Sequence, residues 1–385
     1  MKGSVIPGRI TEAREARVLS MGDLADRIGV TRQSVSKYER GIMNPSPDVL
    51  QSISFLLRFP IDFFYKEEMG MAAGRSPLFF RSKSNITKKA KTACKHQVKW
   101  VGEVKGQLEK YVEFLDQKPP TIDINHEDLQ DKDIEELALS VRREWELGDA
   151  PVGDLIGILE NQGIIVAQFA GNEFCSFNGI DAYSAWCDGA PYIIYNAKQK
   201  SAVRTRFSLL HELGHLIMHS SISEEDSIKK EIVDFADMQA DRFAAAFLLP
   251  ATSFPNDVRG TSLAYLEIIK KKWGAAMSAM IKRCETMNLL TCSQIDYLNR
   301  QMTTNRYWYK EPLDDVLEIE PPEMLRDAVY LLIENNIITR DTFLNKCALP
   351  AKDLQCICSL PDDFFDSCMR KQKPVLKVVK TKENE

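Results

Sequence analysis

The sequence predicts a mainly helical protein with a small β-sheet: an N-terminal helix-turn-helix bundle, a central α+β domain and a helical C-terminal region. Residues 8–66 show short helical patterns separated by tight turns. Short apolar runs at 163–166, 180–186 and 192–195 lie between longer helical stretches and predict strands. Residues 260–370 keep a helical pattern that is interrupted only near prolines.

Composition limits the class of protein. The 385 residues allow two to three domains, and an apolar fraction of 44% is enough for sizeable cores. Nine cysteines without a CxxC pair fit neither a disulfide framework nor a thiolate zinc site. Because we find no signal-peptide pattern and no membrane-spanning run, we expect a cytoplasmic protein without a membrane partner.

The first two helical segments that follow residue 20 have clear end signals. Ser20 can cap a helix over 21–28, and Gly29 suits a left-handed C-terminal cap. Thr31 then caps a helix that runs to Arg40. Two short helices locked together in this way form a helix-turn-helix.

The helix over 31–40 is apolar on one face only. The other face presents four side chains that suit base edges and phosphates, because Arg and Lys pair with guanine and Gln with adenine. We expect these four to contact DNA: Arg32, Gln33, Ser36 and Lys37. The alternative is a small helical bundle that serves only protein contacts or dimerisation.

Residues 9–66 resemble the phage-repressor (Cro/C1, or XRE) helix-turn-helix family. The resemblance is carried by GVTRQSVS at 29–36, YERG at 38–41 and NPS at 44–46. It implies a DNA operator as partner, with base contacts from Arg32, Gln33 and Lys37. We also count a homodimer among the expected partners.

A basic segment follows the bundle. Residues 75–110 contain ten Lys or Arg and two Glu. We interpret the part from Lys88 to Lys110 mainly as a helix with a solvated basic face; contact with DNA phosphates, which would make binding salt-dependent, is the alternative.

The central segment contains the motif HELGH at 211–215. Two histidines four residues apart lie on one helix face, so His211 and His215 can bind one metal ion, and Glu212 can hold a water as catalytic base. On the predicted helix over 231–249, Asp237 and Asp241 share a face. One carboxylate could bind the metal while the other orients a ligating histidine through its second nitrogen.

Residues from about 75 onward resemble the ImmA/IrrE family of metallopeptidases. The matching segments are 79–81, 180–184, 192–196, 206–215 with His219, 240–244 and 248–250. The resemblance implies a zincin-like metallopeptidase domain with Zn²⁺, or another divalent metal such as Mn²⁺. The family's usual third ligand is a Glu three residues before the Ala at 240, where this sequence has Asp237.

The role of His219, four residues after His215, differs from that of the two motif histidines. It lies two helical turns from His211, too far for easy joint binding of one metal. We expect it at the cleft wall or beside a ligating histidine, as we expect Asp241 to be.

These observations divide the chain into five segments: a helix-turn-helix domain at 1–68, a linker and basic helical segment at 69–130, an HExxH metallopeptidase core at 131–255, a helical region at 256–370 and a disordered tail at 371–385. The expected function is a DNA-binding transcriptional regulator with zinc-dependent endopeptidase activity. Its substrate would be a helix-turn-helix repressor, cleaved to derepress phage, mobile-element or stress genes. The alternative is a non-catalytic regulator whose metal domain is a sensor or scaffold.

Overall fold

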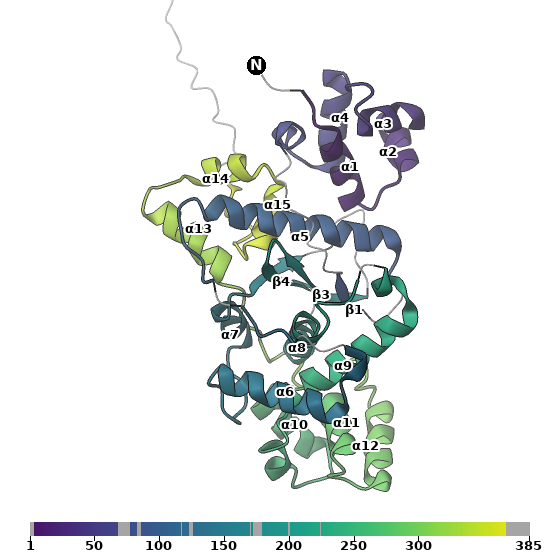
Figure 1. Cartoon of the computed structure of the whole chain (residues 1–385), viewed down its shortest axis with the longest axis vertical. Helices are drawn as coiled ribbons and strands as arrows, with labels where there is room; N and C mark the ends of the chain where they lie inside the picture. Colours follow the sequence, from purple (N-terminus) through teal and green to yellow (C-terminus); the bar gives the residue numbers. More distant parts are fainter. Residues whose placement is uncertain are drawn as a thin grey trace, which may run out of the picture.

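The computed structural model describes residues 4–67, 78–82, 86–116, 118–122, 126–169, 171, 179–198, 201–223 and 225–366. The described residues form fifteen α-helices and one four-stranded sheet, which confirms the expected mainly helical fold (Figure 1). The expected tail at 371–385 lies outside the described residues.

The N-terminal bundle begins with α1 (Pro7–Ala16) and continues with α2 (Met21–Ile28), α3 (Arg32–Glu39), α4 (Pro47–Leu57) and a 3-10 helix, η1 (Ile61–Tyr65). Its end signals act as the sequence predicts. Ser20 accepts a hydrogen bond from the backbone N–H of Asp23, Gly29 is left-handed with φ of 71°, and Thr31 caps α3.

The sheet has the strand order β1 (Phe79–Ser82), β3 (Ile180–Cys187), β4 (Ala190–Asn196) and β2 (Ile165–Phe169). Strands β1 and β4 both run antiparallel to β3, whereas β2 runs parallel to β4. The strand expected at 163–166 begins two residues later, because Gly163 still belongs to the turn after α7 (Leu155–Asn161) and has φ of 72°. Strand β1 is not among the predicted strands, and its four residues pair with β3 along one edge of the sheet.

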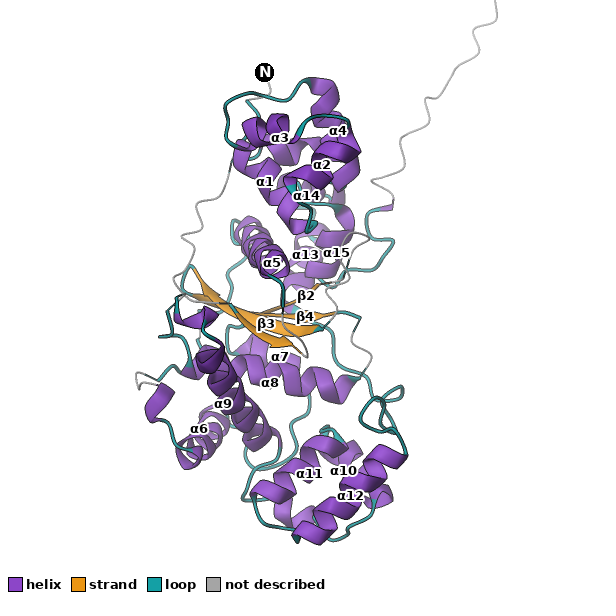
Figure 2. Cartoon of the chain, turned by 90° about the vertical axis from the view of Figure 1, so that its right-hand side faces the viewer, coloured by secondary structure: helices purple, strands orange, loops and turns teal. Residues whose placement is uncertain are grey.

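Two hydrophobic cores lie on opposite faces of this sheet (Figure 2). On one face, Tyr183 and Ile194 pack in a core with α5 (Lys88–Leu108) and the N-terminal bundle. On the other face, Ala182 and Ile193 pack in a core with α8 (Ala202–Met218) and α9 (Lys230–Leu248). The alternation of strand side chains therefore separates the core that contains the N-terminal bundle from the core that contains the HELGH helix.

The helix α5 differs from the expected solvated linker helix. One of its faces is basic, but another buries apolar side chains along its whole length: Ala93, Cys94, Val98, Trp100, Val101, Val104 and Leu108. These side chains join the core that covers the sheet. The basic composition concealed this role because lysines lie between the buried positions.

Apolar residues recur at helical spacing over 132–160 and predict a helix there, but the structure interrupts it. The segment contains α6 (Asp131–Glu144) and α7, separated by a turn in which Glu146 and Gly148 have positive φ. Asp154 then caps α7 by accepting a hydrogen bond from the backbone N–H of Gly157 at 2.8 Å. The polar stretch between the two apolar patterns therefore breaks the helix.

The C-terminal helices pack in two places. Helices α10 (Leu263–Trp273), α11 (Met277–Thr286) and α12 (Cys292–Thr304) join the core around α8 and α9. Helices α13 (Met324–Glu334), α14 (Arg340–Cys347) and α15 (Ala351–Ile357) instead cross to the core around α5. The expected single C-terminal region therefore contributes to both sides of the sheet.

Two expectations from composition can be compared with the described residues. Their cysteines form no disulfide, as the spacing predicts. None of their helices combines the length and the hydropathy that crossing a bilayer requires.

The junction of α7 and α13 generates a prediction on pH. Burial raises the pKa of Glu160 from 4.5 to about 7, although the backbone N–H groups of Glu323 and Met324 donate to its carboxylate and act the other way. Folding therefore favours the neutral carboxyl group. The contribution of Glu160 to the free energy of unfolding is fully present below pH 4.5 and is lost as the pH rises through about 7.

We expect Glu160→Gln to remove this pH dependence, because the amide oxygen still accepts both hydrogen bonds without a charge. Above pH 7 the variant should gain as much as about 3 kcal/mol in unfolding free energy over the wild type, and almost nothing below pH 4.5. Urea unfolding at pH 4.5, 6 and 8 measures the difference. An equal difference at all three values would contradict the assignment.

Candidate metal centre

The candidate site is built on α8 and α9. Helix α8 is buried along almost its full length and carries His211, Glu212 and His215. Gly214 lets α9 approach, since a Cβ there would lie 3.2 Å from the Cα of Ala240 and 3.3 Å from the ring of Phe243. This close crossing places the carboxylates of α9 beside the motif histidines.

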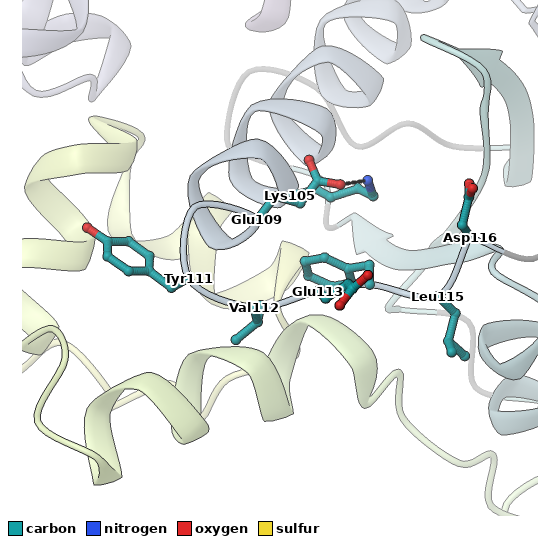
Figure 3. Close-up of a pocket in the computed structure, with 8 residues that line it drawn as sticks. Lys105, Glu109, Tyr111, Val112, Glu113, Leu115 and Asp116 are labelled. Carbon is teal, nitrogen blue, oxygen red and sulfur yellow. Dashed lines mark hydrogen bonds and ion pairs between the residues drawn. The ribbon is translucent and has the colours of Figure 1, made fainter.

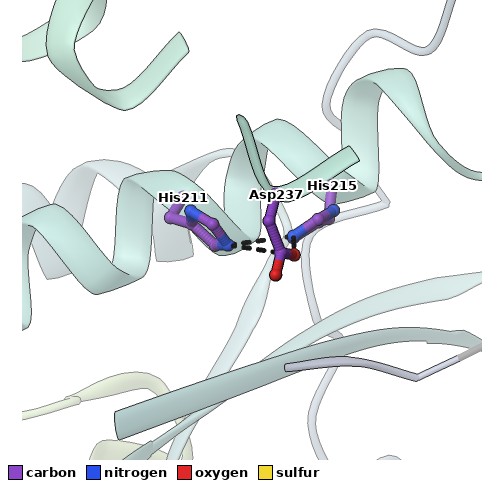
Figure 4. Close-up of side chains that lie close together, drawn as sticks. All are labelled: His211, His215 and Asp237. Carbon is purple, nitrogen blue, oxygen red and sulfur yellow. Dashed lines mark hydrogen bonds and ion pairs between the residues drawn. The ribbon is translucent and has the colours of Figure 1, made fainter. Parts of the chain in front are cut away.

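Three potential ligand atoms converge at this crossing (Figure 4). The Nε2 atoms of His211 and His215 face each other at 3.0 Å, and Oδ1 of Asp237 lies 3.8 Å from the first and 3.3 Å from the second. Both histidines are buried, whereas 39% of the Asp237 side chain is exposed. The group therefore opens to solvent on the α9 side.

The second nitrogen of His211 is held from α9. Its Nδ1 lies 2.8 Å from Oδ1 of Asp241, an exposed carboxylate one helical turn beyond Asp237. Because a carboxylate accepts, Nδ1 carries the proton and Nε2 keeps its lone pair for a metal. The structure thus places Asp241 where the sequence predicts an orienting residue.

The second nitrogen of His215 is held through a buried relay. Nδ1 of His215 lies 2.9 Å from Nδ1 of His219, and Nε2 of His219 lies 3.0 Å from Oε1 of Gln239. The amide nitrogen of Gln239 donates to the carbonyl of Leu129, so its oxygen accepts from His219. His219 then accepts from His215, which leaves Nε2 of His215 unprotonated. His219 therefore orients a ligand, and Gln239 is a member of the site that sequence reasoning missed.

Glu212 is fully buried and has a partner on the sheet. The hydroxyl of Ser184, on β3, donates to Oε2 of Glu212 at 2.6 Å. The sequence contains Ser184 within a segment of family resemblance, but nothing in its spacing indicates this contact. The alternation along β3 is the one signal that could have found it, because it turns Ser184 and Ala182 toward α8.

The edge strand β1 forms one wall of the site. The ring of Phe79 stacks on His215 with centroids 4.4 Å apart and an interplanar angle of 7°. Phe79 also packs with Ile222 and Ala236, so the wall is apolar. A stacked ring limits the orientations that the imidazole can adopt, and it excludes water from one side of His215.

The donor set fits a zinc-type ion. Two imidazole nitrogens and one carboxylate oxygen are the ligands of catalytic zinc in many hydrolases. Their ligand atoms all lie within 4.8 Å of one another. The contacts of His211 with Asp241 and of His215 with His219 leave the lone pair of each Nε2 atom facing the site. Within the described residues, no second cluster of three His, Cys, Asp or Glu has this geometry.

The expected DNA-contacting residues lie on α3. Arg32, Gln33 and Lys37 are exposed, whereas Ser36 is half-buried. Val35 and Tyr38 face the bundle core, so the helix presents its polar side outward as the sequence predicts. The structure thus separates these residues from the metal centre by the whole thickness of α5 and the sheet (Figure 1).

A groove of about 530 Å³ lies at the C-terminal end of α5 (Figure 3). It is lined by Lys105, Glu109 and residues 111–116. None of the candidate ligands or DNA-contacting residues belongs to it.

Comparison with known proteins identifies two of the domains. A family model described as helix-turn-helix matches residues 10–64, and a model described as IrrE N-terminal-like domain, of the Peptidase_M78 family, matches residues 175–285. The chain therefore combines a helix-turn-helix domain of the XRE type with an IrrE/ImmA-like domain, which confirms both resemblances.

Curated relatives match a short part of the chain. An uncharacterized HTH-type transcriptional regulator of Sinorhizobium medicae is 32% identical over 72 residues, which are 19% of this chain and 52% of the relative. An uncharacterized transcriptional regulator in the ATPase CF(0) region of Rhodospirillum rubrum is 41% identical over 59 residues, or 15% and 55%. The chain thus spans about half the length of the curated relatives it matches.

The geometry predicts which carboxylate of α9 matters most. We expect Asp237→Ala to lower zinc affinity more than Asp241→Ala, because Asp237 faces both Nε2 atoms while Asp241 touches only the second nitrogen of His211. Asp234→Ala, one turn earlier and exposed, is the control and should retain the metal. Titration with a competing chelator gives the affinities. If Asp234→Ala alone lost the metal, the ligand assignment would be wrong.

Proposed function

We propose that the chain is a DNA-binding transcriptional regulator whose IrrE-like domain is a metal-dependent endopeptidase. The observation that supports it most strongly is the convergence of His211, His215 and Asp237 next to a buried Glu212. Two independent relays keep the ligand nitrogens unprotonated. Structural packing alone has no need of buried His211, Glu212 and His215 at this position, because each must be desolvated and then satisfied.

The proposed reaction is hydrolysis of a peptide bond. Zn²⁺, or another divalent ion such as Mn²⁺, would be held by the two histidines and Asp237, and when bound it supplies Lewis acidity that acidifies water and polarises a carbonyl. Glu212 takes the proton of the attacking water and returns it to the leaving amine. Ser184 fixes one oxygen of that carboxylate, so the base keeps a single orientation.

The proposed substrate is a helix-turn-helix repressor, cut in an exposed linker where extended backbone is accessible. The attachment of a DNA-binding bundle to the IrrE-like domain supports this choice, because it brings the active site to the places where repressors bind. The expected homodimer and the operator sequence stay predictions.

We expect Glu212→Gln to abolish cleavage while zinc content and DNA binding are retained, because the variant loses the base and keeps every ligand. Purified wild type and variant, loaded with zinc or manganese, are incubated with repressors from the same genome and read by mass spectrometry. Glu231→Gln, an exposed carboxylate at the start of α9, is the matched control.

Two results would overturn this proposal. Full cleavage by Glu212→Gln would remove the assigned base. Metal-loaded wild type that cleaves no repressor, yet releases DNA when the metal is removed, would establish the non-catalytic sensor instead.

We expect Arg32→Ala and Gln33→Ala to weaken sequence-specific DNA binding by about 1–3 kcal/mol each, because each lost base contact carries that magnitude. Zinc content should not change. Fluorescence anisotropy on a duplex selected by the wild-type chain from a random pool measures the effect. Arg300→Ala, an exposed arginine on α12, removes the same charge and should bind like wild type. Unchanged affinity in both α3 variants would contradict readout by this helix.

A further inference from the structure

A groove of about 510 Å³ lies where the N-terminal bundle meets the first turns of α5. Four helices and one turn line it: the end of α1 with the turn that follows, the start of α2, the start of α3 and the start of α5. Its cationic lining side chains are Arg14, Arg32, Lys88 and Lys89. Arg32 is the residue that we assign to base contact, so the lysines of α5 are its direct neighbours across the groove.

The position of α5 relative to α1 is fixed by buried ion pairs. Glu12 accepts hydrogen bonds from Arg9, Lys99 and the indole of Trp100, at 3.0, 2.7 and 2.6 Å. Burial alone would raise the pKa of Glu12, but the charges of Arg9 and Lys99 and the hydrogen bonds outweigh it and lower this pKa below its usual value. Glu12 is therefore ionised, and it holds the two helices together as a charged, satisfied group.

Other contacts extend this junction. Arg9 also pairs with Glu103 at 2.8 Å, and Glu15 lies 3.0 Å from His96. The aromatic core continues beneath them through Phe59 and Trp100. The recognition helix and the first turn of α5 therefore belong to one packed unit, and a ligand on one of them meets the other at a defined place.

The basic side chains of α5 fall into two classes. Lys99 and Lys105 are engaged by Glu12 and Glu109, and Lys91 lies over the ring of Phe80. The side chains of Lys88 and Lys89 are exposed, and among the described residues no hydrogen bond or ion pair is formed by either side chain.

Acidic groups near the groove leave a positive excess. Glu15 is paired with Arg14 and His96, and Asp23 is bonded to the backbone N–H of Ser20, although its charge also faces Lys89. Arg32 and Lys88 have no such counterpart among the described residues.

The two lysines also oppose the helix dipole. They occupy the first two positions of α5, and the first turn holds no acidic residue. Cations at a helix N-terminus are destabilising, whereas anions are stabilising there. The stability of α5 therefore does not explain why lysines occupy positions 88 and 89. An anionic partner bound at this end of the helix would explain them, because its charge interacts favourably with both lysines and with the helix dipole.

We infer that the phosphodiester backbone of duplex DNA continues from α3 across the first turn of α5, where Lys88 and Lys89 bind its phosphates. This inference rests on the proposed DNA binding of α3 and extends it, because part of the interface then belongs to the helix that covers the sheet of the IrrE-like domain. Contacts with phosphates add affinity without sequence preference and make it depend on salt.

The test compares full-length variants on the duplex selected by the wild-type chain. We expect the double variant Lys88→Ala/Lys89→Ala to bind roughly tenfold more weakly at physiological salt, and to reduce the slope of log K against log salt by about 2. Its preference over a scrambled duplex should stay as in wild type. Lys88→Arg/Lys89→Arg should restore the affinity. Lys271→Ala/Lys282→Ala, on α10 and α11, removes the same charge from exposed positions elsewhere and is the matched control.

The outcomes separate this inference from the proposed function. A double variant that matches the control in affinity and slope overturns the α5 contact, while a loss of preference in Arg32→Ala would still support readout by α3. Failure of the wild type to select any duplex overturns both. Thermal unfolding of each variant excludes misfolding, and removal of two cations from a helix N-terminus should leave the melting temperature unchanged or slightly higher.

Discussion

The close crossing of α8 and α9 at Gly214 is the constraint on which the candidate metal centre depends. A Cβ at this position would lie 3.2 Å from the Cα of Ala240, so a larger residue would require the two helices to move apart. Asp237 is one methylene shorter than the Glu usual in the resembling family, and it still reaches within 3.3 Å of His215. The same crossing brings Asp241 and Gln239 to the histidines.

The sheet and α5 join the two halves of the molecule through consecutive residues. Glu15 of the bundle pairs with His96 of α5, and the next residue, Gln97, accepts a hydrogen bond from Tyr183 of β3. Burial raises the pKa of Tyr183 well above its usual value, so the phenol stays a neutral donor. The neighbouring Ser184 points to the other face and donates to Glu212. The alternation of one strand thus gives the helix-turn-helix bundle and Glu212 a shared support.

Local signals allowed much of this to be predicted. These signals each depend on residues within a few positions of each other: the spacing of HELGH, the pair of aspartates on one face, and the caps at Ser20, Gly29 and Thr31. The structure contains the predicted caps, and it places the aspartates beside the motif histidines. Ser184, Gln239 and Phe79 could not be found in this way. Their contacts with the motif come from tertiary packing between elements that lie 20 to 136 residues apart in the chain, and the only local trace of it is the alternation along β3, which turns Ser184 toward α8. The burial of α5 was missed for a related reason: its apolar face is interleaved with lysines.

The polar groups inside α8 explain why the site is held so completely. Glu212, His215 and His219 are fully buried, and polar groups left unsatisfied at such positions would each cost about 1–3 kcal/mol. Hydrogen bonds offset this cost: Ser184 of β3 donates to Glu212, and His215 bonds to His219, which bonds to Gln239 of α9. The ring of Phe79 from β1 adds packing on His215. Satisfying these groups also fixes their tautomers and orientations. The contacts that make the buried histidines tolerable to the fold are therefore the same contacts that prepare them to bind a metal, so stability and the proposed chemistry place the same demand on this region.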